Sequence, residues 1–117
     1  MFNMYQIKTT KLFDKRFANL KKFFNLTQDE ANDAIESLKY TMRLLQQNGK
    51  LPRNGNSSND PDGPYYDHEL TDEPWIGFNE YHILGDVLVV YYKLESKRTI
   101  RFTTITSHSE LRQGNLD

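Results

Sequence analysis

The hydrophobic pattern of this chain changes near Trp75, and that change restricts the fold more than any other feature. Before residue 50, apolar residues recur every three or four positions, as they do along one face of a helix. From Trp75 onward, three segments rich in aromatic and β-branched residues have the composition of strands. Helices followed by strands predict an α+β fold, with two helices packed on one face of a small antiparallel sheet.

Two helices that form a hairpin are expected in the first half. The first is expected over about residues 10–24. The second begins after Thr27-Gln28-Asp29-Glu30, a capping box in which the Thr27 hydroxyl and the Glu30 carboxylate each satisfy a backbone amide, and Asn48-Gly49 predicts its end. The apolar stripes are Phe13, Phe17, Leu20 and Phe24 in the first helix, and Ala31, Ile35, Leu38, Met42 and Leu45 in the second.

Four strands are expected, at Met4–Lys8, Trp75–Ile83, Val87–Leu94 and Thr99–Thr106. The connections at residues 84–86 and 95–98 are short enough for antiparallel hairpins. The run Val87-Leu88-Val89-Val90 is apolar on both faces, which predicts the central strand. The rings of Trp75, Tyr91 and Tyr92 are interpreted as core.

The composition fits one domain over residues 1–117 with a modest core, because 37% of the residues are hydrophobic. Residues 52–64, rich in Asn, Gly, Pro and Ser, predict a flexible loop. The absence of cysteine excludes a disulfide frame, a thiolate nucleophile and a cysteine-based zinc site. No apolar stretch approaches the roughly 20 residues of a membrane span, and the N-terminal residues lack a signal pattern. A cytoplasmic protein without membrane contact is therefore expected.

The net charge of −1 conceals an uneven distribution. Residues 1–50 hold nine Lys and Arg against five Asp and Glu, whereas residues 51–74 hold one against six. A basic first half is compatible with a polyanionic or acidic partner. Charges on the solvated faces of two helices explain the same counts, and we favour that interpretation on charge alone.

The three histidines, His68, His82 and His108, all lie in the second half. Imidazole gives and takes protons near neutral pH, so these residues and Asp86 could form a metal-free acid/base centre. The same four side chains are ordinary ligands for zinc or iron. Only His82 and Asp86 are closely spaced, which makes the metal site the weaker interpretation. A small enzyme is predicted.

Short motifs carry a resemblance to a known family: Tyr66-Asp67-His68-Glu69-Leu70, Trp75-Ile76-Gly77, His82 followed by Asp86, Val89-Val90-Tyr91-Tyr92-Lys93-Leu94, Arg101-Phe102 and Ser107-His108-Ser109-Glu110-Leu111. In these motifs, and in its helical hairpin and strand order, the chain resembles the YafQ branch of the RelE/ParE toxin superfamily. The resemblance extends from about Tyr5 to Leu111, and it implies a RelE-like fold.

The resemblance further implies the toxin of a type II toxin–antitoxin system, an endoribonuclease that cleaves translated mRNA at the ribosome. It assigns catalysis to His68, His82, Asp86 and His108, with no cofactor, and phosphate binding to Arg101. The implied partners are mRNA, the ribosome and a cognate antitoxin, which is a dimeric DNA-binding protein whose tail wraps the toxin. The toxin alone is not expected to contact DNA.

The residues fit this chemistry because RNA carries its own nucleophile, the 2'-hydroxyl beside the scissile phosphate. One group must remove the 2'-proton, a second must protonate the departing 5'-oxygen, and a cation must stabilise charge on the phosphate. We cast His68 or His82 as the base and His108 as the acid, with Asp86 orienting an imidazole. Which histidine is base and which is acid stays open.

The chain departs from the family pattern at Val87, Thr104 and Arg112, where relatives often carry tryptophan, arginine and an aromatic residue. Arg112 is expected to stack its guanidinium on RNA in place of a ring. An alternative function is that of a noncatalytic ParE-like toxin, which inhibits DNA gyrase by binding. The histidine set argues against it, because such a binder has no need of acid/base residues.

Overall fold

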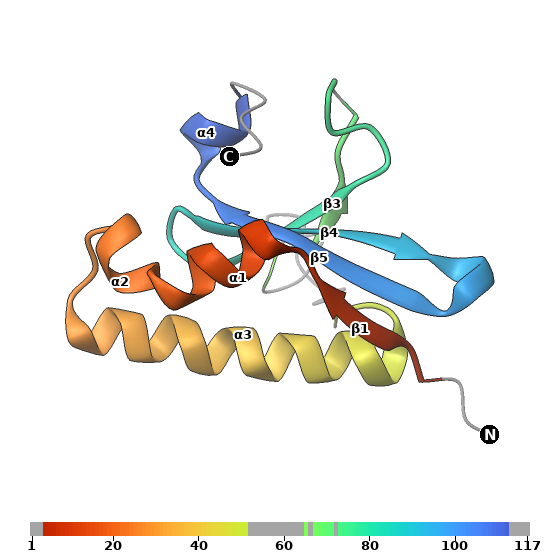
Figure 1. Ribbon diagram of the computed structural model, residues 1–117, viewed down its shortest axis with the longest axis horizontal. Helices are drawn as coiled ribbons and strands as arrows, with labels where there is room; N and C mark the ends of the chain where they lie inside the picture. The colour runs from red at the N-terminus through yellow and green to blue at the C-terminus, as the bar shows by residue number, and fades with distance from the viewer. Residues whose placement is uncertain (1–3, 52–64, 66, 72, 113–117) are drawn as a thin grey trace, which may run out of the picture.

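The structure is a computed structural model that describes residues 4–51, 65, 67–71 and 73–112. Its elements are β1 (Gln6–Thr9), α1 (Lys11–Ala18), α2 (Leu20–Phe23), α3 (Gln28–Asn48), β2 (His68–Glu69), β3 (Asn79–Leu84), β4 (Val87–Leu94), the 3-10 turn η1 (Glu95–Lys97), β5 (Thr99–Thr106) and α4 (His108–Arg112). Five strands form one sheet in the order β1-β5-β4-β3-β2. The helices α1 to α3 lie on one side of the sheet, whereas α4 and the segment before β3 rise from the other (Figure 1). The predicted α+β class is confirmed.

The long helix α3 begins and ends at the predicted signals. The Thr27 hydroxyl accepts a hydrogen bond from the Glu30 amide at 3.1 Å, and the Glu30 carboxylate accepts one from the Thr27 amide at 2.9 Å. Gly49 ends the helix in the left-handed region with φ of 73°. A Cβ at this position would also collide with the ring of Tyr5. Glycine is therefore required here by both backbone conformation and packing.

The first predicted helix, over residues 10–24, is in fact two helices that meet at Asn19. The N-cap Thr10 begins α1, and its side chain accepts a hydrogen bond from the Phe13 amide at 3.0 Å. The Asn19 side chain donates to the carbonyl of Lys15 at 2.9 Å, a local bond that competes with the regular helical pattern. The apolar stripe still points inward on both sides of the break, with Phe13 and Leu20 buried.

The sheet is antiparallel except at one edge. The pairs β3–β4 and β4–β5 are antiparallel, as the short hairpins predicted, and the unpredicted strand β2 also pairs antiparallel with β3. The edge strand β1 instead runs parallel to β5, with Ile7 opposite Ile100. A parallel pair needs a long connection, and here the chain between β1 and β5 contains the three helices and strands β2 to β4. The prediction of a wholly antiparallel sheet is wrong for this pair.

The strand predicted at Trp75–Ile83 differs from the structure at its ends. The segment expected to be a strand from Trp75 begins pairing only at Asn79, because residues 75–78 form a turn closed by a 2.9 Å bond from the Phe78 amide to the Trp75 carbonyl. The predicted loop at 52–64 lies outside the described residues. The central strand is as predicted, since Val87-Leu88-Val89-Val90 is buried throughout.

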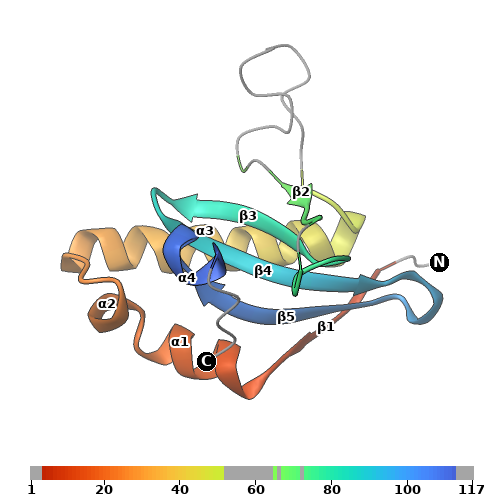
Figure 2. The same ribbon diagram turned by 90° about the horizontal axis from the view of Figure 1, so that it is seen from above.

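Two apolar clusters cover the two faces of the sheet. The main core lies between the sheet and the helices, and its buried members are Tyr5, Phe13, Leu20, Ala34, Leu38, Leu45, Leu51, Tyr81, Val87, Val89, Tyr91, Ile100, Phe102 and Ile105. A smaller cluster of Trp75, Leu88, Val90 and Leu111 lies on the opposite face. Seen from above, α4 lies over that face with α3 behind the sheet (Figure 2).

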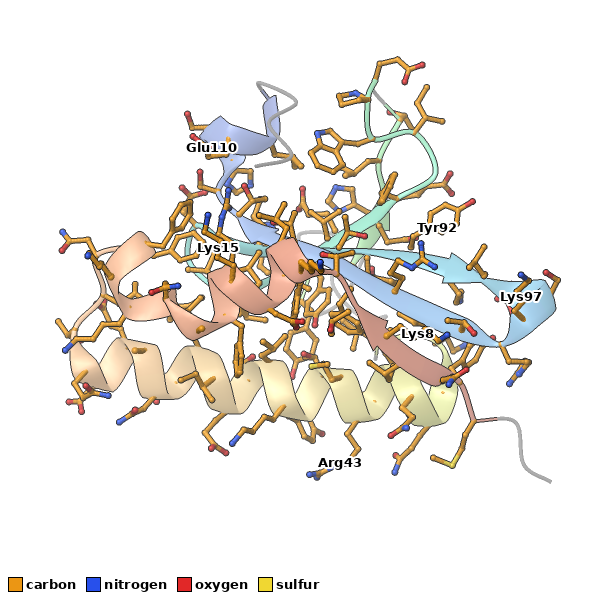
Figure 3. All side chains as sticks on the ribbon, viewed as in Figure 1. Lys8, Lys15, Arg43, Tyr92, Lys97 and Glu110 are labelled. Carbon is orange, nitrogen blue, oxygen red and sulfur yellow. The ribbon has the colours of Figure 1, made fainter. Side chains whose placement is uncertain are left out.

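The surface bears out some expectations and corrects one. Arg43 projects from the outer face of α3 (Figure 3), and Lys39 on the same helix is also exposed, as solvated helix faces require. Trp75 and Tyr91 are core as predicted, but Tyr92 is exposed: strand alternation turns it away from the main core, and it is not among the buried residues of the smaller cluster. Among the described helices, none is long and apolar enough to cross a membrane.

Candidate active site

The candidate site lies on the sheet face that points away from α1 to α3. Side chains of residues that are paired across two strands project from the same face of the sheet. The residues that pair with β4 therefore show which side chains share a face. Leu88 lies opposite His82, Val90 lies opposite Glu80, and Tyr92 lies opposite Arg101. His82, Glu80 and Arg101 therefore project from the same face, in that order along β4.

Glu80 is the buried centre of this face, with 3% of its surface exposed. His82, two residues along β3, places Nε2 3.1 Å from the Glu80 Oε1 atom. His68 on β2 pairs with Glu80 across the strands, and its Nε2 atom lies 3.9 Å from the same oxygen. One carboxylate thus contacts two of the three predicted histidines. Because a carboxylate only accepts hydrogen bonds, it orients the His82 ring with Nε2 as the donor.

His108 reaches the site from the start of α4. Its ring Nδ1 atom lies 2.5 Å from Asp86 Oδ1, and its backbone amide donates to the same oxygen at 3.0 Å. Asp86 follows Gly85 in the turn between β3 and β4, where Gly85 has φ of 47°. The predicted contact between Asp86 and an imidazole is therefore present, and the imidazole is that of His108.

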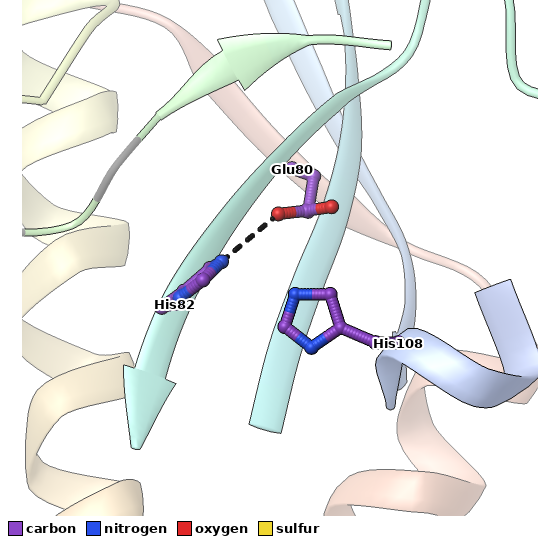
Figure 4. A group of neighbouring side chains, drawn as sticks. All are labelled: Glu80, His82 and His108. Carbon is purple, nitrogen blue, oxygen red and sulfur yellow. Dashed lines mark hydrogen bonds and ion pairs between the residues drawn. The ribbon is translucent and has the colours of Figure 1, made fainter. Parts of the chain in front are cut away.

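The rings of His82 and His108 face each other edge to face, with centroids 5.2 Å apart. Because Asp86 engages Nδ1 of His108, the Nε2 atom lies on the opposite side of the ring, toward Glu80 and His82 (Figure 4). The structure thus brings together all three histidines, which come from β2, β3 and α4. Elements far apart in the sequence meet because β3 and β5 both pair with β4.

Packing beneath α4 fixes the position of His108. The Trp75 indole donates to the carbonyl of Leu111 at 2.9 Å, and the Ser107 hydroxyl accepts from the Glu110 amide at 3.3 Å. Trp75 and Leu111 also line a cleft of about 500 Å³ together with His68, Glu69, Leu70, Thr71 and Glu73. The cleft adjoins the imidazoles through His68 and offers space for part of a substrate.

Asp67 supports the segment that carries His68. The hydroxyl of Tyr91 donates to both Asp67 carboxylate oxygens at 2.8 Å. Burial raises the pKa of the Asp67 carboxyl above its usual range, and the hydrogen bond from Tyr91 opposes that rise. Burial, reinforced by the charge of Asp67, also raises the pKa of Tyr91. The contact between Asp67 and Tyr91 holds the residue before β2 against the central strand β4.

The other predicted site residues have different outcomes. Arg101 is exposed on the candidate face beside Tyr92, two positions along β4 from the Glu80 row. Arg112 belongs to α4, but its side chain lies outside the described structure. Thr104 and Val87 are both buried, and their side chains lie on opposite faces of the sheet.

Sequence reasoning missed Glu80. An acidic residue in a strand usually faces solvent, and nothing in the composition separates Glu80 from its neighbours. One signal was available: Glu80 lies two residues before His82, and side chains two apart in a strand project from the same face.

Solved structures of similar fold include two toxins. YafQ from E. coli strain BL21(DE3) is 23% identical, with a TM-score of 0.62 over 92% of this chain and 97% of that chain. A metal-bound toxin from Helicobacter pylori is 28% identical, with a TM-score of 0.60 over 92% of this chain and 99% of that chain.

A third similar structure is a complex. E. coli YafQ bound to DinJ is 24% identical, with a TM-score of 0.61 over 92% of this chain and 97% of that chain. No curated protein sequence matches the chain significantly. The family model described as "Bacterial toxin of type II toxin-antitoxin system, YafQ" matches residues 5–113. The chain therefore belongs to the YafQ family of toxins of type II toxin–antitoxin systems.

Proposed function

We propose that this YafQ-family toxin is an endoribonuclease that cleaves translated mRNA at the ribosome by acid/base catalysis. One observation carries the proposal: three imidazoles meet on one sheet face, and carboxylates orient two of them. Such a set of oriented proton donors and acceptors is what RNA cleavage by the 2'-hydroxyl needs. A toxin that acts only by binding has no use for it.

The reaction needs two proton transfers and one stabilised phosphate. The base takes the 2'-proton, the 2'-oxygen bonds to phosphorus, and the bond from phosphorus to the 5'-oxygen breaks as the acid protonates that oxygen. His108 suits the acid, because Asp86 occupies Nδ1 and leaves Nε2 to exchange a proton with the substrate. His82 or His68 serves as the base beside Glu80.

Glu80 and Arg101 complete the proposed site with opposite charges. The buried Glu80 carboxylate holds the His82 ring and balances positive charge that an imidazole gains when it accepts the 2'-proton. Arg101 projects from the same face two positions along β4, which supports a role in binding a phosphate of an RNA strand that runs along the sheet. The exposed Tyr92 ring beside it offers a surface for stacking a base.

We infer that a cognate antitoxin holds the toxin inactive in the cytoplasm, where its mRNA substrate is translated. E. coli YafQ, which shares this fold, is found in complex with DinJ. An inhibitor that covers the imidazole face would prevent the toxin from reaching RNA.

The proposal is tested by mixing the purified toxin with ribosomes programmed with a defined mRNA and mapping both ends at each cut. Acid/base cleavage by the 2'-hydroxyl predicts a 2',3'-cyclic phosphate on one fragment and a 5'-hydroxyl on the other. The matched His108→Ala variant, which lacks the proposed acid, should leave the mRNA intact. Intact mRNA with the folded wild type, or cuts that persist in the variant, would contradict the proposal.

A further inference from the structure

We propose that Glu80, His82 and His108 form a binding site for one zinc ion, and that occupation of this site switches the nuclease off. Each of the three residues offers one ligand atom, and these atoms all lie within 4.8 Å of one another (Figure 4). Two imidazoles and one carboxylate are a common ligand set for zinc. A zinc ion bound to both imidazoles would prevent their ligating nitrogen atoms from giving or accepting protons.

The distances are close to those that zinc requires. Ligand atoms about 2.0–2.2 Å from zinc lie roughly 3.3 Å apart in a tetrahedral site. His82 Nε2 and Glu80 Oε1 already meet this spacing at 3.1 Å. His108 has to move inward by a small rotation of its ring, and its side chain is 45% exposed, so neighbouring atoms leave it room.

The surroundings of His108 resemble the outer shell of a zinc site. Histidines that bind metals usually donate their other ring nitrogen to a carboxylate or carbonyl, which fixes the ring and makes the ligating nitrogen more basic. Asp86 contacts Nδ1 of His108 in this way and turns Nε2 toward Glu80 and His82. This arrangement is a second observation in favour of a metal, independent of the clustering of ligands.

The ligand types and the buried charge favour zinc over magnesium. Glu80 is a buried carboxylate between imidazoles, and a divalent cation would neutralise its charge in a site where few water molecules can do so. Magnesium prefers near-octahedral oxygen ligands and keeps its water, so it does not suit this set. Three protein ligands leave a fourth zinc position for water.

Zinc binding is measured by titrating the purified full-length toxin with zinc chloride in a calorimeter, with magnesium chloride as the negative control. The wild type should bind one zinc ion per chain and gain thermal stability. Glu80→Gln, His82→Gln and His108→Gln should each abolish this binding. Cobalt(II), whose visible spectrum reports four-coordinate nitrogen and oxygen ligands, gives a readout independent of heat.

Two further variants sharpen the test. Asp86→Asn keeps the three ligands but weakens the hold on His108, so zinc affinity should fall by roughly 10–100-fold. His68→Gln changes a histidine of the same face that is not in the ligand group, and its zinc affinity should stay within a few-fold of wild type. The far-ultraviolet circular dichroism of every variant shows whether it is folded. No saturable zinc binding by the wild type, or binding that survives all three ligand substitutions, would overturn the site.

The switching half of the inference rests on the proposed nuclease function, and the binding half does not. One equivalent of zinc should suppress mRNA cleavage, and a chelator should restore it. Cleavage that is lost in the chelator would overturn the assignment of zinc as an inhibitor. The zinc affinities of the wild type and the variants could follow the predictions above while the wild type never cleaves mRNA. That result would contradict the proposed nuclease function and leave the proposed zinc site unaffected.

Discussion

Asp86 accepts two hydrogen bonds from His108, one from the backbone amide at 3.0 Å and one from Nδ1 of the ring at 2.5 Å. An Asp in a tight turn commonly bonds its own backbone, but this one reaches across to the first residue of α4. The contact fixes both where α4 begins and which way the imidazole points. It is the clearest sign that the turn between β3 and β4 serves the site as well as the sheet.

Asp86→Asn should lower mRNA cleavage by roughly 10–100-fold, less than the loss expected when His108 itself is removed. The amide fills the same volume but carries no charge, so it holds the His108 ring less firmly. Single-turnover cleavage rates measure the effect, with Asp33→Asn on the exposed side of α3 as the control. Equal rates for wild type and Asp86→Asn would mean that this contact only shapes the turn.

Arg101→Gln should weaken binding of an uncleavable RNA that lacks the 2'-hydroxyl at the cut. Losing one phosphate contact should also lower the slope of log affinity against log salt by about 1. The matched control is Arg43→Gln, since Arg43 projects from α3 on the opposite side of the molecule (Figure 3). Fluorescence anisotropy over a series of salt concentrations gives both numbers, and a slope that changes equally in the two variants would contradict phosphate binding by Arg101.

Asp67→Asn should raise stability at neutral pH and have no such effect in acid. Because burial raises the folded-state pKa of Asp67 above its unfolded value, its contribution to stability is present below the unfolded pKa. That contribution is lost as the pH rises through the raised folded pKa. Asn keeps an oxygen for the Tyr91 hydroxyl and does not ionise.

The measurement for Asp67 is urea unfolding of wild type and variant between about pH 4 and pH 7, starting near the ordinary pKa of an aspartate. The stability difference should grow in favour of Asp67→Asn across this range. Asp33→Asn, at an exposed position, should show no comparable trend. A difference that shrinks with rising pH would show that Asp67 is more stable as the anion in the folded protein.

Leu38→Ala should lower the free energy of unfolding by about 2–5 kcal/mol. Leu38 is 1% exposed in the core between α3 and the sheet, so truncation leaves a cavity. The neighbouring Lys39 is exposed, and Lys39→Ala should change stability by less than about 0.5 kcal/mol. Chemical denaturation of both variants tests whether the predicted helical stripe carries the core.

Local signals in the sequence predicted the elements whose ends they define. Thr27 and Gly49 mark both ends of α3, and the segments rich in aromatic and β-branched residues mark β4 and β5. The break at Asn19 was not predicted, because a side-chain bond to the Lys15 carbonyl leaves no trace in hydrophobic spacing. The parallel direction of β1 was missed for a related reason: it depends on where the helices return the chain.

The site was predictable in its residues but not in its connections. The histidines and Asp86 stand out because few side chains can exchange protons near neutral pH as imidazole does. In addition, the spacing of these residues resembles that of a known toxin family. The burial of Glu80 between His82 and His68 depends on the pairing of β2 with β3. Strands this short leave no clear pattern in the sequence, so the pairing could not be predicted. The pairing of β4 with β5 shows that Tyr92 and Arg101 share the candidate face, whereas composition placed Tyr92 in the core.

The central claim is tested most directly by inducing the wild type and His108→Ala in cells and mapping new 5' ends on a reporter mRNA by primer extension. Ser109→Ala, an exposed neighbour on α4, serves as the control. We predict cuts within the translated frame for wild type and Ser109→Ala, and none for His108→Ala. Growth arrest that is equal in all three without new ends would contradict the account and favour a toxin that acts by binding, such as the ParE-like inhibitors of DNA gyrase.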